Sequence, residues 1–255
     1  MTRPVVVLSH CLADEACRYD GEALRDPVVA MLAPFVTFRP VCPEIAIGLG
    51  VPRDPVHLVE CGSGVAMVQP STGLDLTERM HAFAARFLTS LGPVDGFLLK
   101  GRSPSCGISE TKVFDRRGER VVRRGDGLFA AAALLAFAGT AVEAEDRLGD
   151  VTIRDRFLTR VFASARLRAV RSTAGLAHLH AEDGTLLLAR SKPAMRALGR
   201  IVASAEGLPF AGVLSRYREE ISRALARPAR AAMRRSDRLP FDPYPAALAA
   251  RLRVG

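Results

Sequence analysis

The chain has 255 residues, of which 49% are hydrophobic and 25% are charged, so it holds enough apolar side chains for one large domain or two smaller ones. It contains no uncharged apolar run long enough to cross a membrane, and its first apolar run is too short for a secretory signal. We therefore expect a cytoplasmic protein without a membrane partner. In that compartment the five cysteines stay reduced, which favours metal binding or catalysis over disulfides.

Short buried strands and amphipathic helices alternate through the N-terminal half. Apolar runs bounded by breakers predict strands at 4–9, 36–41, 94–99 and 140–143. Helical spacing predicts helices at 27–33, 76–91 and 128–137, and two short hairpins are expected at 56–68 and 112–122. This alternation is typical of an α/β fold, Rossmann-like, with a mostly parallel sheet and flanking helices.

The pattern changes near residue 149, after which apolar residues follow a helical spacing and strand signals stop. We expect helices at 153–170, 176–188, 193–205 and 210–226. The sequence thus predicts an α/β domain over 1–148 and a smaller all-α domain over 149–255. The charge divides in the same way, with a net of −3 over residues 1–150 and +12 over residues 151–255. A basic domain favours an anionic partner, nucleic acid first.

Three cysteines each follow a predicted strand: Cys11, Cys42 and Cys106. If these strands are parallel neighbours, the thiols meet at the carboxyl edge of the sheet, where open α/β sheets bind ligands. Cysteine is the usual ligand of iron–sulfur clusters, and a cubane with three protein ligands keeps one iron open to a substrate atom. The alternative is that they are small buried core residues. Cys61, in a hairpin turn, is expected to have no catalytic role.

Two polar residues stand at short offsets from these cysteines. Glu44 follows Cys42 by two residues, and its carboxyl group could move protons or activate water beside a cluster. Ser103 precedes Cys106 by three residues, so its hydroxyl group could face the same cavity. The alternatives are a helix N-terminal acid for Glu44 and an ordinary turn serine for Ser103.

A further set of residues has a less certain part in such a site. Arg18, Asp20 and Arg53 are candidates for substrate contact, although each also suits a surface ion pair. Cys17 is a possible extra thiol, and the alternatives for it are an additional ligand, a resolving thiol or a bystander.

The motifs around these residues resemble the thiouracil desulfidase family. They are Ser9-His10-Cys11-Leu12, Cys17-Arg18-Tyr19-Asp20-Gly21, Cys42-Pro43-Glu44 and the run from Lys100 to Gly107. The resemblance covers residues 1 to about 148 and implies a [4Fe-4S] cluster held by Cys11, Cys42 and Cys106, with the open iron taking the sulfur of a thiolated uracil. It implies that Glu44 is the catalytic acid or base and that Ser103 is the supporting hydroxyl. Ser105, in the last motif, is a further candidate for substrate contact.

The C-terminal part resembles the helical domain often fused to this family. The segments that carry the likeness are 154–157, 176–189, 195–200 and 242–245. Two-domain proteins of this kind look like desulfidases of thiouridine in tRNA, which makes tRNA the expected partner. The helical insert between Leu225 and Leu239 is shortened here, and Ala181-Glu182-Asp183 stands where basic residues are common in the family.

The sequence therefore supports three candidate functions. The first is a cluster-dependent desulfidase, in which water replaces the sulfur of a thiolated pyrimidine and sulfide leaves without net redox change. The second is a cluster-dependent hydratase or lyase acting on a hydroxy acid, with the same open iron binding a hydroxyl group. The third is a non-catalytic RNA-binding protein with a structural metal.

Overall fold

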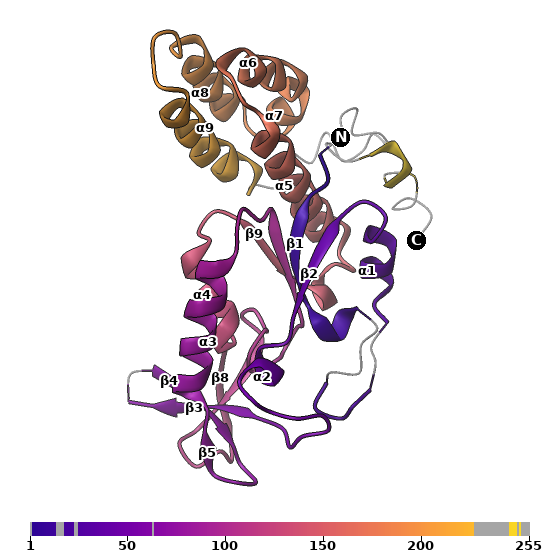
Figure 1. The fold of residues 1–255 in the computed structure, drawn as a ribbon, viewed down its shortest axis with the longest axis vertical. Helices are drawn as coiled ribbons and strands as arrows, with labels where there is room; N and C mark the ends of the chain where they lie inside the picture. Colours follow the sequence, from indigo (N-terminus) through magenta and orange to yellow (C-terminus); the bar gives the residue numbers. More distant parts are fainter. Residues whose placement is uncertain are drawn as a thin grey trace.

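The computed structural model describes residues 2–13, 18–22, 25–62, 64–226, 245–248 and 250. Three parts follow one another along the long axis of the molecule (Figure 1): a bundle of helices, a parallel sheet of four strands covered by helices, and a second sheet of five strands. Cys17, most of the shortened insert between Leu225 and Leu239, and much of the segment 242–245 lie outside the described residues.

The central sheet is made of four parallel strands. They lie in the order β2 (Thr37–Val41), β1 (Val5–Ser9), β6 (Gly96–Leu99) and β9 (Ala141–Ala144). Every residue of β6 is buried, because helices cover both faces of the sheet, and this explains the uninterrupted apolar sequence of that strand. The predicted α/β fold with a mostly parallel sheet, flanking helices and a helical C-terminal part is confirmed.

Successive side chains of the central strands enter two different cores. One core packs alternate strand residues against α3 (Thr77–Ser90) and α4 (Leu128–Ala136). The other packs the remaining strand residues against α1 (Pro27–Leu32) and α5 (Val151–Ala169). The alternation is visible along β1, where Val7 belongs to the first core and Val6 and Leu8 to the second. α5 therefore belongs to the packing of the sheet as well as to the helical bundle.

Asp95 fixes α5 to the sheet at the end opposite the cysteines. Its buried carboxylate accepts hydrogen bonds from Ser164 Oγ at 2.9 Å, from Arg168 Nη2 at 2.8 Å and from the backbone N–H of Val5 at 2.9 Å. The side chain of Asp95 is fully buried. A buried charge is tolerated when it is paired and hydrogen-bonded in this way.

The second sheet joins the two predicted hairpins. Its strands are, in order, β5 (Leu74–Asp75), β4 (Gly64–Gln69), β3 (His57–Cys61), β7 (Thr111–Phe114) and β8 (Val121–Gly125). The pairs β3–β4 and β7–β8 are antiparallel, as expected from their turns, whereas β3 and β7 pair in parallel. The sequence predicts each hairpin but not the pairing that unites them.

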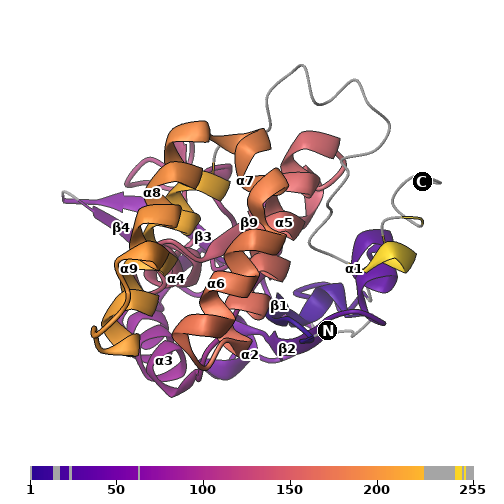
Figure 2. The same ribbon diagram turned by 90° about the horizontal axis from the view of Figure 1, so that it is seen from above.

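The helical part consists of α5, α6 (Thr173–Glu182), α7 (Gly184–Arg190), α8 (Lys192–Ala203) and α9 (Phe210–Leu225), seen from above in Figure 2. The single helix expected over 176–188 is wrong, because the chain breaks at Asp183. The buried Asp183 carboxylate forms an ion pair with Arg166 of α5, which stabilises the break. The core of this part includes the fully buried Tyr217.

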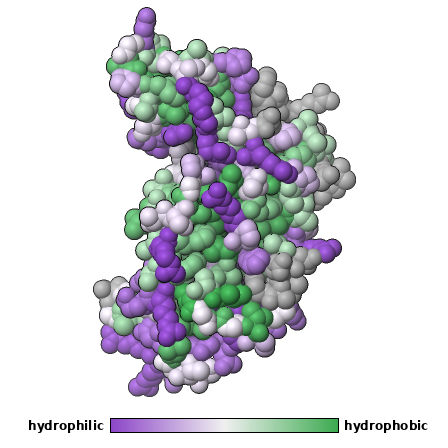
Figure 3. Space-filling view, viewed as in Figure 1, coloured by the Kyte–Doolittle hydropathy of each residue, from purple (hydrophilic) through white to green (hydrophobic). Residues whose placement is uncertain are grey.

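The surface of the helical part carries both hydrophilic and apolar side chains in the view of Figure 3, and a broader apolar surface lies lower down, over the level of α3 and α4. Between those two helices Leu88, Leu135 and Phe137 line an apolar groove. None of the helices in the described ranges combines the length and the apolar character that a bilayer crossing requires.

Candidate active site

The three cysteines lie in segments that follow the carboxyl ends of the strands, at the point where the strand order of the sheet reverses. The chain passes from β1 to β2 on one side and later to β6 on the other, so a crevice opens beyond the carboxyl end of β1. Cys11 lies in the 3₁₀ turn η1 (His10–Leu12) after β1, Cys42 comes directly before α2 (Pro43–Ala46), and Cys106 lies in the loop after β6. All three line one cavity of about 520 Å³, within the size range of small-molecule sites.

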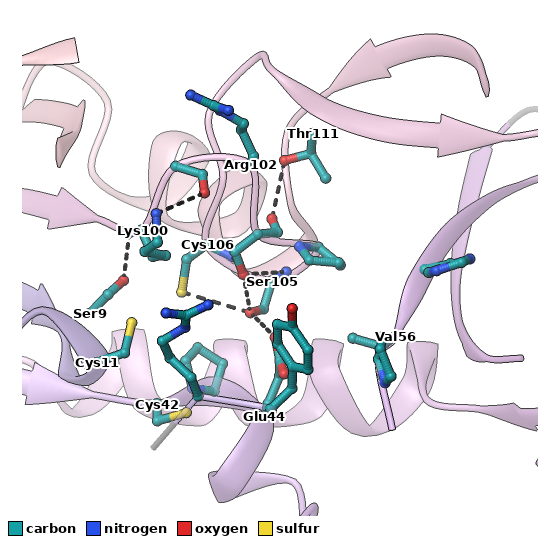
Figure 4. A pocket seen from close by; sticks show the side chains of 18 of the residues that line it. Ser9, Cys11, Cys42, Glu44, Val56, Lys100, Arg102, Ser105, Cys106 and Thr111 are labelled. Carbon is teal, nitrogen blue, oxygen red and sulfur yellow. Dashed lines mark hydrogen bonds between the residues drawn. The ribbon is translucent and has the colours of Figure 1, made fainter. Parts of the chain in front are cut away.

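Figure 4 shows how the cavity is arranged. The sulfur atoms of Cys11, Cys42 and Cys106 lie on one side and Val56 lies on the other, with the side chains of Glu44 and Ser105 between them. The three thiols and the carboxylate, predicted from three separate motifs, therefore share one cavity.

The loop that carries Cys106 is held at both ends. The hydroxyl of Ser9, at the end of β1, accepts a hydrogen bond from the backbone N–H of Lys100 at 2.9 Å. The ammonium group of Lys100 forms an ion pair with the buried Glu145, which also accepts from the N–H of Gly101. At the far end a Cβ atom on Gly107 would lie 2.8 Å from the carbonyl oxygen of Ser103, so only glycine fits there without displacing backbone.

Burial raises the pKa of two of the thiols. The pKa of Cys11 rises to about 12 because the side chain is desolvated and because Cys106 and Cys42 lie close enough to repel its negative charge. The pKa of Cys106 also rises to about 12, mainly through burial, against hydrogen bonds from Ser9 and Ser105 that lower it. Three thiols that influence one another inside a cavity form a soft donor set, the kind that iron–sulfur clusters use.

The donor set also fits a cluster in its spacing. In the described part of the chain no three His, Cys, Asp or Glu side chains stand close enough together to hold a single metal ion. The ligands of a cubane stand further apart, since each cysteine binds a different iron atom. Cys11, Cys42 and Cys106, from three strand ends around one cavity, suit that wider arrangement.

Glu44 lies in the first turn of α2, yet its carboxylate points into the cavity. Ser105 Oγ donates a hydrogen bond to Glu44 Oε1 at 2.8 Å, and two N–H groups of Arg53 donate to Glu44 Oε2 at 2.9 and 2.7 Å. Glu44 is buried. The carboxylate is thus held by a neutral donor on one oxygen and a cation on the other.

Ser103 makes a different set of contacts. Its Oγ accepts from the backbone N–H groups of Ser105 at 3.3 Å and Cys106 at 3.2 Å, and it lies 3.0 Å from Ser105 Oγ. Ser103 therefore shapes the loop that presents Cys106, whereas the hydroxyl that contacts Glu44 belongs to Ser105. Ser105 Oγ also lies 3.8 Å from the sulfur of Cys106.

The mouth of the cavity is built partly from the second sheet. His57 of β3 stacks on Phe114 of β7, with ring centroids 4.5 Å apart and an interplanar angle of 10°. Burial, together with the charge of Lys112, lowers the pKa of His57. Arg18 and Tyr19 also line the cavity. Asp20 forms an ion pair with Arg18 at 2.8 Å and is not among the described residues that line the cavity.

The structure thus brings most of the sequence candidates to one place: Cys11, Cys42, Cys106, Glu44, Ser103, Ser105, Arg18 and Arg53. Cys61 is exposed at the hairpin turn and outside the described lining. His57 and Phe114 are additions to the sequence candidates, because nothing near them in the sequence marks a site. Arg53, for which a surface ion pair was the alternative, forms a buried one.

Two family models match separate parts of the chain. Residues 6–145 match the model described as 2-thiouracil desulfurase, and residues 185–235 match one described as a protein of unknown function, DUF1722. The uncharacterized protein YbbK of Bacillus subtilis (strain 168) is 28% identical over 154 residues, which are 58% of this chain and 99% of that protein. A solved structure titled [4Fe-4S]-dependent thiouracil desulfidase TudS is 31% identical, covering 58% of this chain and 94% of that one, with a TM-score of 0.45.

Proposed function

Because this chain belongs to the 2-thiouracil desulfurase family, we propose that it is a thiouracil desulfidase, which replaces the sulfur of a thiolated uracil by oxygen and releases sulfide. The observation that carries this proposal is the shared cavity, where Cys11, Cys42 and Cys106 face a buried carboxylate and its serine partner. The reaction is a hydrolysis. Water supplies the oxygen to the ring carbon, its two protons leave with the sulfur, and no electrons are exchanged.

Cys11, Cys42 and Cys106 hold a [4Fe-4S] cluster in this proposal. Such a cluster supplies one iron without a protein ligand, a Lewis-acid position for the thiocarbonyl sulfur. The protein supplies the walls and the ligands. Cys106 is buried and Cys11 and Cys42 are partly exposed to the cavity, and the loop between Lys100 and Gly107 sets the place of Cys106.

Glu44 and Ser105 move the protons of the reaction. Glu44 Oε1 accepts a hydrogen bond from Ser105 Oγ, which lies 3.8 Å from the sulfur of Cys106, so a water molecule or ring nitrogen bound there can exchange a proton with the carboxylate. Ser103 supports them by holding the backbone of the loop. Arg18, fixed by Asp20, contacts the substrate at the mouth of the cavity.

The helical part, with its boundary near residue 149, is the tRNA-binding domain in this proposal. The support is its net charge of +12 and a line of exposed cations on α8, namely Lys192, Arg196 and Arg200. Steps of four residues place these side chains on one face of the helix, about 6 Å apart along its axis. The cytoplasm, where thiols stay reduced and tRNA is present, is the proposed location.

The test begins with protein purified without oxygen. Iron and acid-labile sulfide per chain and the visible absorbance are measured first, and the protein is then incubated with 2-thiouracil, 4-thiouracil, the corresponding nucleosides and thiolated tRNA. We expect sulfide and the oxygenated base in equal amounts. Turnover of hydroxy acids without sulfide release would favour the hydratase or lyase instead, and a folded, iron-free protein from this preparation would refute both enzymes.

A further inference from the structure

Arg53 approaches Glu44 in an unusual way. Its Nε and Nη2 atoms both donate to the same oxygen, Oε2, at 2.9 and 2.7 Å. A guanidinium that pairs with a carboxylate commonly places one N–H on each oxygen. Because both N–H groups converge on Oε2, the other oxygen stays available, and it is this one that accepts from Ser105.

The guanidinium of Arg53 is itself held in place. The backbone N–H of Arg53 donates to the carbonyl of Tyr19 at 2.8 Å, and Nη1 of the guanidinium donates to the carbonyl of Gly50 at 3.1 Å. Only 6% of the Arg53 side chain and 11% of the Glu44 side chain are exposed. The ion pair is therefore buried and preorganised, so little rearrangement is needed to keep the carboxylate in one orientation during a reaction.

The chain contains a structural counterpart of this arrangement. Asp95, at the opposite end of β6, is also bound by one serine and one arginine, Ser164 and Arg168. There the arginine contacts both carboxylate oxygens and the backbone N–H of Val5 donates to one of them, so each oxygen accepts at least two hydrogen bonds. The same two residue types thus saturate both oxygens of the Asp95 carboxylate, whereas at Glu44 the arginine binds Oε2 alone and leaves Oε1 to Ser105.

From this difference we infer that Arg53 is a positioning residue for desulfidation: it holds Glu44 by Oε2 and thereby aims Oε1 and Ser105 toward the three thiols. The inference rests on the proposed function. It assigns to Arg53 a role in the rate of the reaction, exerted through its ion pair with Glu44.

The test compares Arg53→Gln and Arg53→Lys with the wild-type protein, all purified without oxygen and carrying their clusters. We expect kcat of Arg53→Gln to fall about 10- to 100-fold, the effect of losing a hydrogen bond to a charged group. KM, iron content and visible absorbance should stay close to the wild-type values. Arg53→Lys, which keeps the charge, should have an intermediate kcat, and added guanidinium ion should restore part of the kcat of Arg53→Ala.

Arg168→Gln is the matched control, with Ser164→Ala as a milder one. Both disturb the carboxylate of Asp95, so they should lower Tm and leave kcat unchanged. A readout independent of activity is a double-mutant cycle of Arg53→Gln and Glu44→Gln in the cluster-free protein. The decrease in Tm of the double variant should be no larger than that of the more destabilised single variant, because the two side chains act as one unit.

The outcomes separate the two levels of the proposal. If the wild-type protein releases no sulfide, the proposed function fails. If it is active and Arg53→Gln keeps its kcat, or if the cycle is additive, the inference is overturned while the function stands. Loss of iron from Arg53→Gln would also overturn it, because Arg53 would then be a structural residue of the cluster site.

Discussion

Ser105 and Ser103 offer the sharpest test of how the site divides its work. Ser105 is 2% exposed and is the hydroxyl donor to Glu44 Oε1 at 2.8 Å. A hydrogen bond to a charged group contributes about 1.5–3 kcal/mol. If the reaction uses that bond in its transition state, Ser105→Ala lowers kcat about 10- to 150-fold. In the described part of the chain the contacts of Ser105 Oγ go to side chains and none to the backbone that carries Cys106, so we expect the iron content to stay close to the wild-type value.

Ser103→Ala should behave in the opposite way. Its hydroxyl accepts from two backbone N–H groups at 3.2 and 3.3 Å, and neutral bonds of this kind contribute about 0.5–1.5 kcal/mol each. The loop would therefore lose about 1–3 kcal/mol of stabilisation. We expect a lower Tm and faster loss of iron on exposure to chelator, with a smaller fall in the kcat of protein that still holds its cluster.

The assay measures kcat per bound iron for both variants, together with Tm and the rate of iron loss. Ser164→Ala is the matched control, because its hydroxyl also donates to a buried carboxylate, Asp95, at 2.9 Å but far from the cysteines. The Ser164→Ala variant should have a lower Tm, with kcat per bound iron and the rate of iron loss unchanged. This division of roles would be refuted if Ser105→Ala kept the wild-type kcat. It would also be refuted if Ser105→Ala lost stability and iron while Ser103→Ala lost kcat.

Three further predictions concern other parts of the chain. Cys106→Ser should lose most of its iron, whereas the exposed Cys61→Ser should keep it; equal iron in the two variants would contradict the ligand set. Burial lowers the pKa of His180, so the unfolded chain takes up a proton first as the pH falls through about 6.5, and stability drops. His180→Gln should show a smaller fall in Tm between about pH 7.5 and about pH 5.5 than the wild-type protein, and an identical fall would refute this assignment. The tRNA prediction uses one variant in which three residues are replaced together: Lys192, Arg196 and Arg200. The slope of log affinity for tRNA against log salt should become less steep by about 2–3, with no change in thiouracil turnover. An unchanged slope would exclude α8 as the tRNA-binding surface.

The strands and the cysteine cavity could be predicted because their signals are local. The strands before Cys11 and Cys106 are short apolar runs that end in a breaker or a polar residue, and parallel pairing with β2, the strand before Cys42, places all three ends at one edge of the sheet. Glu44 could be predicted for the same reason, since Pro43 and the start of α2 place it close to Cys42. No long-range contact had to be known beyond the assumption that the strands are neighbours.

The contacts that refine the site could not be predicted, because they join segments without any shared pattern. Arg53 could have formed a surface ion pair with any nearby acid, and only the fold of the loop before β3 brings it to Glu44. Likewise, helical spacing continues across Asp183, and the break there depends on Arg166, which lies on a different helix. A periodic pattern does not contain such a tertiary partner.

The second sheet bears on the choice of substrate. Each of its hairpins can be predicted separately, but the parallel register between Leu58 of β3 and Val113 of β7 is what places His57 against Phe114 at the mouth of the cavity. The thiols and the carboxylate belong to local motifs and determine the chemistry. The wall opposite them, which includes His57 and Phe114, depends on a pairing between distant hairpins. The sequence therefore identifies the family and the groups at the centre of the site by their motifs, while the shape of the opposite wall has to be determined from the fold.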